Sequence, residues 1–290
     1  MKHNLKYVFF GTPGFAAIIL EKLIEAGWPP LAIVCNPDRP IGRKKTITPP
    51  PTKVLAEKYA IKVYQPEKLE IEKLKLEIGE IDFAIVAAYA KIIPKEILTI
   101  PRLGVIGVHP SLLPKYRGSS PIQSVILNGD SETGVSLFLI DEQIDHGKTL
   151  STIKYQILNN DNYEILNKKL AELGASLLIE TLPKFIKNEI TPLSQNENKA
   201  THTKKFITED GYVDLRKDEP AVIERKIRAL NPDPGVWTLA NPAQIASPVQ
   251  TKNFSENEKR VKLLEAELVD GKLKLTKIQV EGKKPRNISY

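Results

Sequence analysis

The sequence predicts an α/β protein: a Rossmann-like, doubly wound and mostly parallel sheet, followed by a small β-barrel domain. Two observations predict the first part: its apolar runs are continuous rather than alternating, and helical patterns separate them. Continuous apolar runs are typical of strands covered on both faces by crossover helices. A third observation predicts the barrel, since the last part of the chain has one helical segment and then short strand-like runs punctuated by Pro and Gly.

The elements of the first domain follow one another in strand–helix order. Tyr7–Gly11 and Leu31–Cys35 read as strands, with a helix near Phe15–Glu25 between them. The elements predicted after these are a helix at 52–59, a short extended segment at 62–64, a helix at 69–78, and strands at 83–87, 105–108, 134–140 and 150–157. Apolar residues at three- and four-residue steps predict a long amphipathic helix over Tyr163–Lys187 that closes the domain.

The second domain is expected after a polar linker. Glu189–Ala200 is rich in Ser, Asn, Gln and Glu, which is typical of a connecting segment. A helix near Ala221–Ala229 and strands at Val261–Glu267 and Lys272–Val280 follow. We therefore expect a first domain over residues 1–188, a linker over 189–204 and a second domain over 205–290.

Composition limits the classes of function. The chain has 290 residues, 41% of them hydrophobic and 27% charged, as in an ordinary globular protein. Its single cysteine, Cys35, excludes an intramolecular disulfide, and its apolar neighbours are typical of a buried strand thiol. The four histidines lack metal-ligand spacing, so we expect no metal.

Charge and hydropathy bear on location and partners. The N-terminal apolar run is cut at Gly11, too early for a signal peptide, and no window approaches the ~18 apolar residues of a membrane helix. We therefore expect a cytoplasmic protein without membrane contact. The net charge of +7 favours a polyanionic partner, although a lysine-rich genome composition would produce the same charge.

The stretch from Gly107 to Gly118 is the strongest candidate for chemistry. His109 falls at the carboxyl end of a predicted parallel strand, where open α/β sheets place their ligand crevice. The loop after it is bracketed by prolines and is expected to be rigid. A histidine in this setting favours a functional role over packing, while a packing role stays open from the spacing alone.

A second stretch, Asp141–Gly147, follows the next predicted strand. It would place Asp145 at a loop tip on the same sheet edge as His109. A carboxylate beside an imidazole orients its tautomer and stabilises its cationic form. The alternative is a solvated hairpin turn.

The third stretch, Pro37–Lys53, is far longer than the usual 2–6-residue connection between α/β elements. It is stiffened by prolines and carries five basic residues against one acidic residue: Arg39, Arg43, Lys44, Lys45 and Lys53. Phosphate contact is one use of such a loop, and a merely solvated basic loop is the other. Gly11–Gly14 lacks both GxGxxG and the Walker lysine, so we read it as a tight turn without nucleotide binding.

Taken together, the motifs resemble those of the methionyl-tRNA formyltransferase family over nearly the whole chain. The matching stretches are Phe9–Ala16, Pro37–Arg43, Ala88–Ala90, Ile92–Pro94, Gly107–Gly118, Ser120–Gln123, Gly129–Gly134, Asp141–Gly147, Ile227–Pro232 and Glu281–Lys284. The resemblance implies a Rossmann-like formyltransferase domain with an OB-like C-terminal domain. It also implies transfer of a formyl group from 10-formyltetrahydrofolate to the α-amine of methionyl initiator tRNA.

The resemblance assigns roles to individual residues. His109 and Asp145 correspond to two catalytic residues of the family, and Gly107 stands where the family has a third, an Asn. The residues that would contact folate are Ser111, Leu112, Leu113, Pro114, Tyr89 and Asp141. The residues that would contact tRNA are Arg39, Arg43, Lys44 and Lys45. Since losing one oxyanion donor costs about 10²–10³ in rate, we expect Gly107→Asn to raise formylation without changing tRNA affinity.

Two rival functions stay open at this point. One is another 10-formyltetrahydrofolate-dependent enzyme, acting on glycinamide ribonucleotide or on an amino sugar linked to a nucleotide. The other is a catalytically weak tRNA- or folate-binding relative, suggested by Gly107. The basic insertion together with a C-terminal domain favours tRNA as the acceptor. A monomer is expected.

Overall fold

The computed structural model describes residues 5–42, 44–69, 79–242 and 258–288. The chain divides into two compact units. Unit 1 comprises residues 1–121, 132–157 and 166–203, and unit 2 comprises 122–131, 158–165 and 204–290. The boundaries expected from the sequence, at 188 and 205, stay a prediction.

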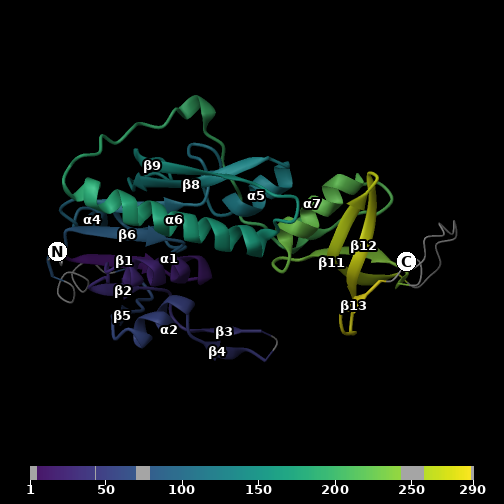
Figure 1. The fold of residues 1–290 in the computed structure, drawn as a ribbon. Coiled ribbons are helices and arrows are strands. Elements are labelled where there is room, and N and C mark those ends of the chain that lie inside the picture. The colour runs from purple at the N-terminus through teal and green to yellow at the C-terminus, as the bar shows by residue number, and fades with distance from the viewer. Residues whose placement is uncertain (1–4, 43, 70–78, 243–257, 289–290) are drawn as a thin grey trace. The chain divides into compact units, whose positions relative to one another are not determined.

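Unit 1 is built on a seven-stranded sheet in the order β5-β2-β1-β6-β7-β8-β9 (Figure 1). The strands are β1 (Tyr7–Gly11), β2 (Ala32–Val34), β5 (Lys62–Tyr64), β6 (Phe83–Ala87), β7 (Val105–His109), β8 (Glu132–Leu139) and β9 (Thr149–Gln156). The first five in this order pair in parallel, whereas β8 and β9 pair antiparallel. The predicted mostly parallel, doubly wound sheet is therefore confirmed.

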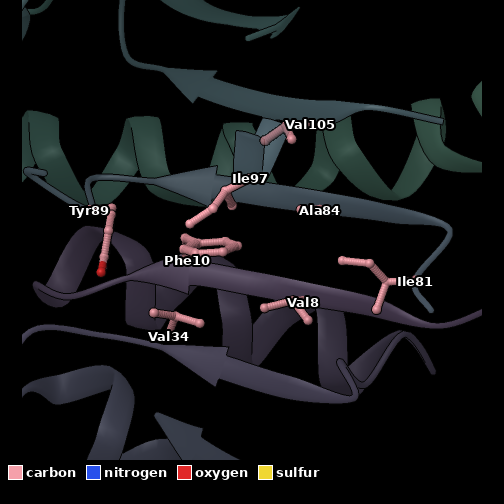
Figure 2. Close-up of a cluster of buried hydrophobic side chains, with 8 residues drawn as sticks. All are labelled: Val8, Phe10, Val34, Ile81, Ala84, Tyr89, Ile97 and Val105. Atoms are coloured by element: carbon pink, nitrogen blue, oxygen red, sulfur yellow. The ribbon is translucent and has the colours of Figure 1, made fainter. Parts of the chain in front are cut away.

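Helices cover both faces of this sheet, which is why its central strands β1, β2, β6 and β7 are buried without alternation. The α-helices that the structure describes in unit 1 are α1 (Gly14–Glu25), α2 (Pro51–Lys58), α4 (Lys95–Leu98) and most of α6 (Tyr163–Ile186). On one face, Ile97 of α4 packs into a buried cluster with Phe10, Ala84 and Val105 (Figure 2). On the other, α6 approaches closely at Gly174, where an added Cβ would lie 3.1 Å from Val108 Cγ1.

The basic insertion of unit 1 has a more regular structure than the sequence predicts. The basic insertion, read as a loop, contains a two-stranded antiparallel hairpin of β3 (Arg39–Ile41) and β4 (Thr46–Thr48), which extends beyond the sheet (Figure 1). Most of the helix predicted at 69–78 lies outside the described residues.

Unit 2 contains the predicted small antiparallel sheet, in the order β10-β11-β12-β13. Its elements are α5 (Pro121–Asn128, from Ile122 onward), the 3₁₀ turn η2 (Thr208–Gly211), α7 (Pro220–Leu230), β10 (Val236–Ala240), β11 (Lys259–Val269), β12 (Lys272–Val280) and β13 (Arg286–Asn287). Ile223 and Ile227 of α7 are buried, as are Leu263 and Ile278 of the sheet. Closure of this sheet into an OB-like barrel stays a prediction.

Across the described ranges, none of the helices combines the length and the apolar character needed to cross a membrane.

Candidate functional site

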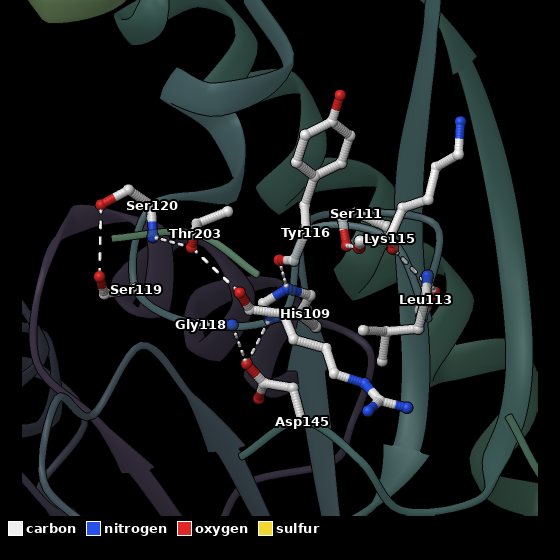
Figure 3. Close-up of polar contacts among 12 residues, drawn as sticks. His109, Ser111, Leu113, Lys115, Tyr116, Gly118, Ser119, Ser120, Asp145 and Thr203 are labelled. Atoms are coloured by element: carbon white, nitrogen blue, oxygen red, sulfur yellow. Dashed lines mark hydrogen bonds and ion pairs between the residues drawn. The ribbon is translucent and has the colours of Figure 1, made fainter. Parts of the chain in front are cut away.

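The site is centred on His109, the last residue of β7, as the strand-end argument predicts. The His109 side chain is 8% exposed. Its Nε2 lies 2.8 Å from the carbonyl oxygen of Tyr116, and since a carbonyl only accepts, Nε2 carries the proton. The Nδ1 atom faces Asp145, 3.5 Å from Oδ2 (Figure 3). That separation is longer than an ordinary N–H···O hydrogen bond, so Nδ1 retains capacity for a further partner.

Asp145 reaches His109 by a route that the sequence argument did not foresee. Strand β8 runs antiparallel to β7 with Leu139 opposite Ile106, and Ile140 N donates to the carbonyl of Val105. The loop after β8 therefore starts beside the beginning of β7 and folds back toward His109. The expected meeting occurs, but it does not come from two strands ending at one edge.

The carboxylate of Asp145 is held by main-chain geometry. Its Oδ2 accepts a 2.8 Å hydrogen bond from Gly118 N (Figure 3). The main chain of Asp145 has a φ of 50°, in the left-handed region, which is an uncommon and strained conformation for a residue with a side chain. Such strain persists only where the surrounding structure enforces it, and strained residues of this kind cluster at functional sites.

The loop expected to contact folate is tied to β8. The carbonyl oxygen of Ser111 accepts a 2.7 Å hydrogen bond from Ser136 Oγ, which in turn accepts one of 3.0 Å from Leu113 N. The Ser111 hydroxyl donates to the carbonyl of Lys115 at 2.6 Å. These bonds fix Ser111–Pro114 in place, with Leu112, Leu113 and Pro114 half-buried.

The other two residues assigned to folate differ in placement. Asp141 lies in the same loop as Asp145 and accepts a 2.7 Å hydrogen bond from His146 Nδ1. The ring of Tyr89 is 2% exposed and packs edge-on against Phe10, 5.5 Å between centroids (Figure 2). Burial raises the pKa of its hydroxyl to about 12. A ligand near Tyr89 would therefore meet its main chain rather than its phenol.

Gly107 is packed against Phe138. The two residues are paired between β7 and β8, and Phe138 is 3% exposed. A Cβ built at Gly107 would lie 2.3 Å from Cε1 and 2.6 Å from Cζ of that ring. Carbon atoms in contact normally stay about 3.5–4.0 Å apart. The ring thus occupies the volume that a side chain at 107 would need.

The basic residues lie on the β3–β4 hairpin. Arg39, Lys44 and Lys45 are exposed there, whereas Arg43 lies outside the described residues. Lys53 is different, because its Nζ is 2.8 Å from Asp38 Oδ2 at the base of the insertion. Lys44 and Lys45 thus lie at the turn of the hairpin, and Arg39 lies at its base, opposite Thr48.

Several residues that contact the pair were missed from sequence. The main chain of Tyr116 and Gly118 binds His109 and Asp145, and Gln195 binds the Asp145 loop. Tyr116 and Gly118 lie within the recognised motif, although nothing in their type indicated a role. Gln195 stood in the polar stretch read as a linker and offered no signal.

No cluster of three or more potential metal ligands occurs among the residues that the structure describes.

The sequence and the fold of this chain match those of known proteins. Residues 5–182 match the formyl transferase family, and residues 205–289 match the formyl transferase C-terminal domain. A methionyl-tRNA formyltransferase of Halalkalibacterium halodurans is 43% identical over 239 residues, covering 82% of this chain and 75% of the relative. One of Bacillus licheniformis is 38% identical, covering 96% and 92%.

A solved structure shares the fold. It is the methionyl-tRNA formyltransferase from Clostridium thermocellum, with a TM-score of 0.60 at 17% identity, covering 95% of this chain and 98% of that one. The match of the family model to residues 5–182 spans more than half of the 290 residues, and its C-terminal companion follows in the same order. This chain therefore belongs to the formyl transferase family.

Proposed function

We propose that this enzyme transfers a formyl group from 10-formyltetrahydrofolate to the α-amine of methionyl initiator tRNA, with His109 and Asp145 as its catalytic pair. The observation that carries the proposal is the 3.5 Å approach of His109 Nδ1 to Asp145 Oδ2 at the end of β7. The two relatives at 38% and 43% identity, both named methionyl-tRNA formyltransferase, support the choice of acceptor.

The pair suits amine attack on a formyl carbon. The amine nitrogen forms a bond to that carbon, the carbonyl oxygen gains negative charge, and the bond to the folate nitrogen then breaks. His109, protonated on both nitrogens, would donate from Nδ1 to the developing oxyanion, since Nε2 is already committed to Tyr116. Asp145 would accept the amine proton, directly or through water, and return it to the departing nitrogen.

The residues beside the pair fit a flat heterocycle with polar edges. The main chain of Ser111–Pro114 is fixed by Ser136, and the half-buried side chains of Leu112, Leu113 and Pro114 offer apolar surface. Asp141 would add a carboxylate on the loop that carries Asp145. In this proposal these residues bind the folate co-substrate, whose part is to supply the activated formyl group.

The acceptor side would use the hairpin. Its exposed Arg39, Lys44 and Lys45 suit phosphate contacts, and Arg43 is assigned with them from the sequence. Because this reaction belongs to translation initiation, we assign the protein to the cytoplasm. We take a monomer as its oligomeric state, as expected from the sequence.

The test is a formylation assay with 10-formyltetrahydrofolate and charged initiator tRNA. Uncharged tRNA, glycinamide ribonucleotide and a nucleotide-linked amino sugar serve as parallel acceptors. We expect product only with the charged tRNA, and a loss of at least about 10²-fold in kcat for His109→Asn and for Asp145→Asn. Product from another acceptor would refute the assigned substrate. A wild-type rate in either variant would refute the assigned pair.

A further inference from the structure

The segment that follows α6 in unit 1 lies alongside the candidate site. Arg117 N donates to the carbonyl of Thr201 at 2.9 Å, and Thr203 N donates to the carbonyl of Arg117 at 2.8 Å. Tyr116 N donates to Thr201 Oγ1 at 2.8 Å. Since the main chain of 116–118 binds both His109 and Asp145, this segment supports the residues that hold the catalytic pair.

One side chain of this segment, Gln195, binds the Asp145 loop directly. Its Nε2 donates to the carbonyl oxygens of Asp145, at 2.9 Å, and of Gly147, at 2.7 Å. Its Oε1 accepts from Arg117 Nε at 3.1 Å and from Nη2 at 2.8 Å. A primary amide has two N–H donors and two acceptor lone pairs, and these four hydrogen bonds use all of them. Reversing the amide would set oxygen against two carbonyls, which fixes its orientation.

Arg117 fixes the other end of the amide. It is 3% exposed, and its guanidinium donates to Glu197 at 2.9 Å through Nη1 and 2.7 Å through Nη2. A guanidinium buried to this extent requires such partners. Hydrogen bonding to Glu197 also raises the pKa of Arg117, a group that is charged in any case. Glu197 thus anchors Arg117, which orients Gln195.

The need for this clamp follows from the shape of the loop. Asp145 adopts a left-handed φ of 50°, and its loop folds back from the far end of β8 to reach His109. A loop in this conformation needs external contacts to keep the carboxylate near the imidazole. Gln195 provides two, on the carbonyls that flank His146.

We propose that Gln195 is a positioning residue for formyl transfer: clamped by Arg117, it sets the main chain of residues 145–147 so that the Asp145 carboxylate faces His109. This inference rests on the proposed role of Asp145 and His109. It assigns a function in the active site to a residue of the segment that the sequence reads as a linker.

The test compares substitutions of Gln195 with a matched control. Gln195→Met keeps the length of the side chain and removes all four hydrogen bonds. Gln195→Glu keeps the acceptors for Arg117 but turns carboxylate oxygen toward the two carbonyls. We expect kcat to fall about 10²-fold in both variants, because a displacement of about 1 Å at a reacting group has an effect of this size. The KM for each substrate should stay within about twofold of the wild-type value. Gln143→Met, at an exposed position of the Asp145 loop, should keep the wild-type kcat.

A double-mutant cycle separates positioning from a general loss of structure. If Gln195 acts through the carboxylate, the double variant Gln195→Met/Asp145→Asn should have a kcat within about threefold of that of Asp145→Asn alone. The inference would be overturned if Gln195→Met lowered kcat as much in the Asp145→Asn background as in the wild type. It would also be overturned if Gln195→Met and Gln195→Glu kept the wild-type kcat while Asp145→Asn was impaired. A wild-type rate for Asp145→Asn itself would instead refute the proposed catalytic pair, and this inference with it.

Discussion

At the scale of single residues, the relation between Gly107 and Phe138 has consequences for catalysis. The resemblance places an Asn at position 107 in the family, and the sequence alone suggests that restoring it adds an oxyanion donor. The structure adds a steric condition, because a Cβ at 107 would lie 2.3 Å from the Phe138 ring. The two positions are therefore coupled and have to be changed together.

We expect Gly107→Asn alone to destabilise unit 1 by about 1–3 kcal/mol through overpacking, with no gain in rate. Removing the ring should change this outcome. With Phe138→Ala as the reference, adding Gly107→Asn should raise kcat by up to about 10²-fold, because the amide gains room beside His109. Urea unfolding and single-turnover formylation measure the two effects. A faster enzyme from the single substitution, at unchanged stability, would contradict the coupling.

At the scale of elements, the β3–β4 hairpin presents the basic residues of the insertion. The pairing of Arg39–Ile41 with Thr46–Thr48 makes the insertion a hairpin, and Asp38 neutralises Lys53 at its base. Lys44 and Lys45 at the turn are exposed. Pairing between the strands presents these charges together, as a phosphate-binding element requires.

We expect Lys44→Ala/Lys45→Ala to weaken initiator tRNA binding and to make its dependence on log salt shallower by about 1.5–2. The kcat at saturating tRNA should change little. The matched control is Lys184→Ala/Lys187→Ala, which removes the same charge from exposed lysines at the end of α6. Equal salt slopes for the hairpin variant and this control would exclude the hairpin from the tRNA contact.

At the scale of the whole molecule, paired carboxylates make the fold sensitive to acid. A hydrogen bond from Lys6 N and a weaker contribution from Arg102 lower the pKa of Asp82. Hydrogen bonds from Lys53 and Gln65 lower the pKa of Asp38. In unit 2, Lys204 and the main chain of Ile207 lower the pKa of Asp210. A carboxyl with a lower pKa in the folded state stabilises that state at pH values above its unfolded pKa. The contribution is lost as the pH falls through the folded pKa.

For Asp82, we expect the stability difference between wild type and Asp82→Asn to be largest above about pH 5, since an unfolded Asp titrates near 3.9. The difference should shrink as the pH falls below about 4. Urea unfolding across pH, in a Trp237→Phe background, reports on unit 1 through Trp28, the other of the two tryptophans. The control is Glu67→Gln, at an exposed position of unit 1. A difference independent of pH would contradict the assigned ion pairing.

The sequence by itself determined the parallel core and the position of His109 at the end of one of its strands. Continuous apolar runs at Tyr7–Gly11 and Phe83–Ala87 predict strands buried on both faces, because local hydropathy reflects burial. The local pattern likewise places His109 at a strand end, where it favours a functional role, and the resemblance adds the catalytic assignment. The sequence also separated the β-rich second domain from the first.

Only the tertiary structure decided how the site is assembled. The antiparallel course of β8, the return of Asp145 to His109, the ring over Gly107 and the clamp by Gln195 join residues far apart in the chain. The hairpin within the basic insertion also depends on pairing between strands. Hydropathy and turn patterns act over a few residues, whereas these contacts depend on strand register and on side-chain volumes brought together by folding.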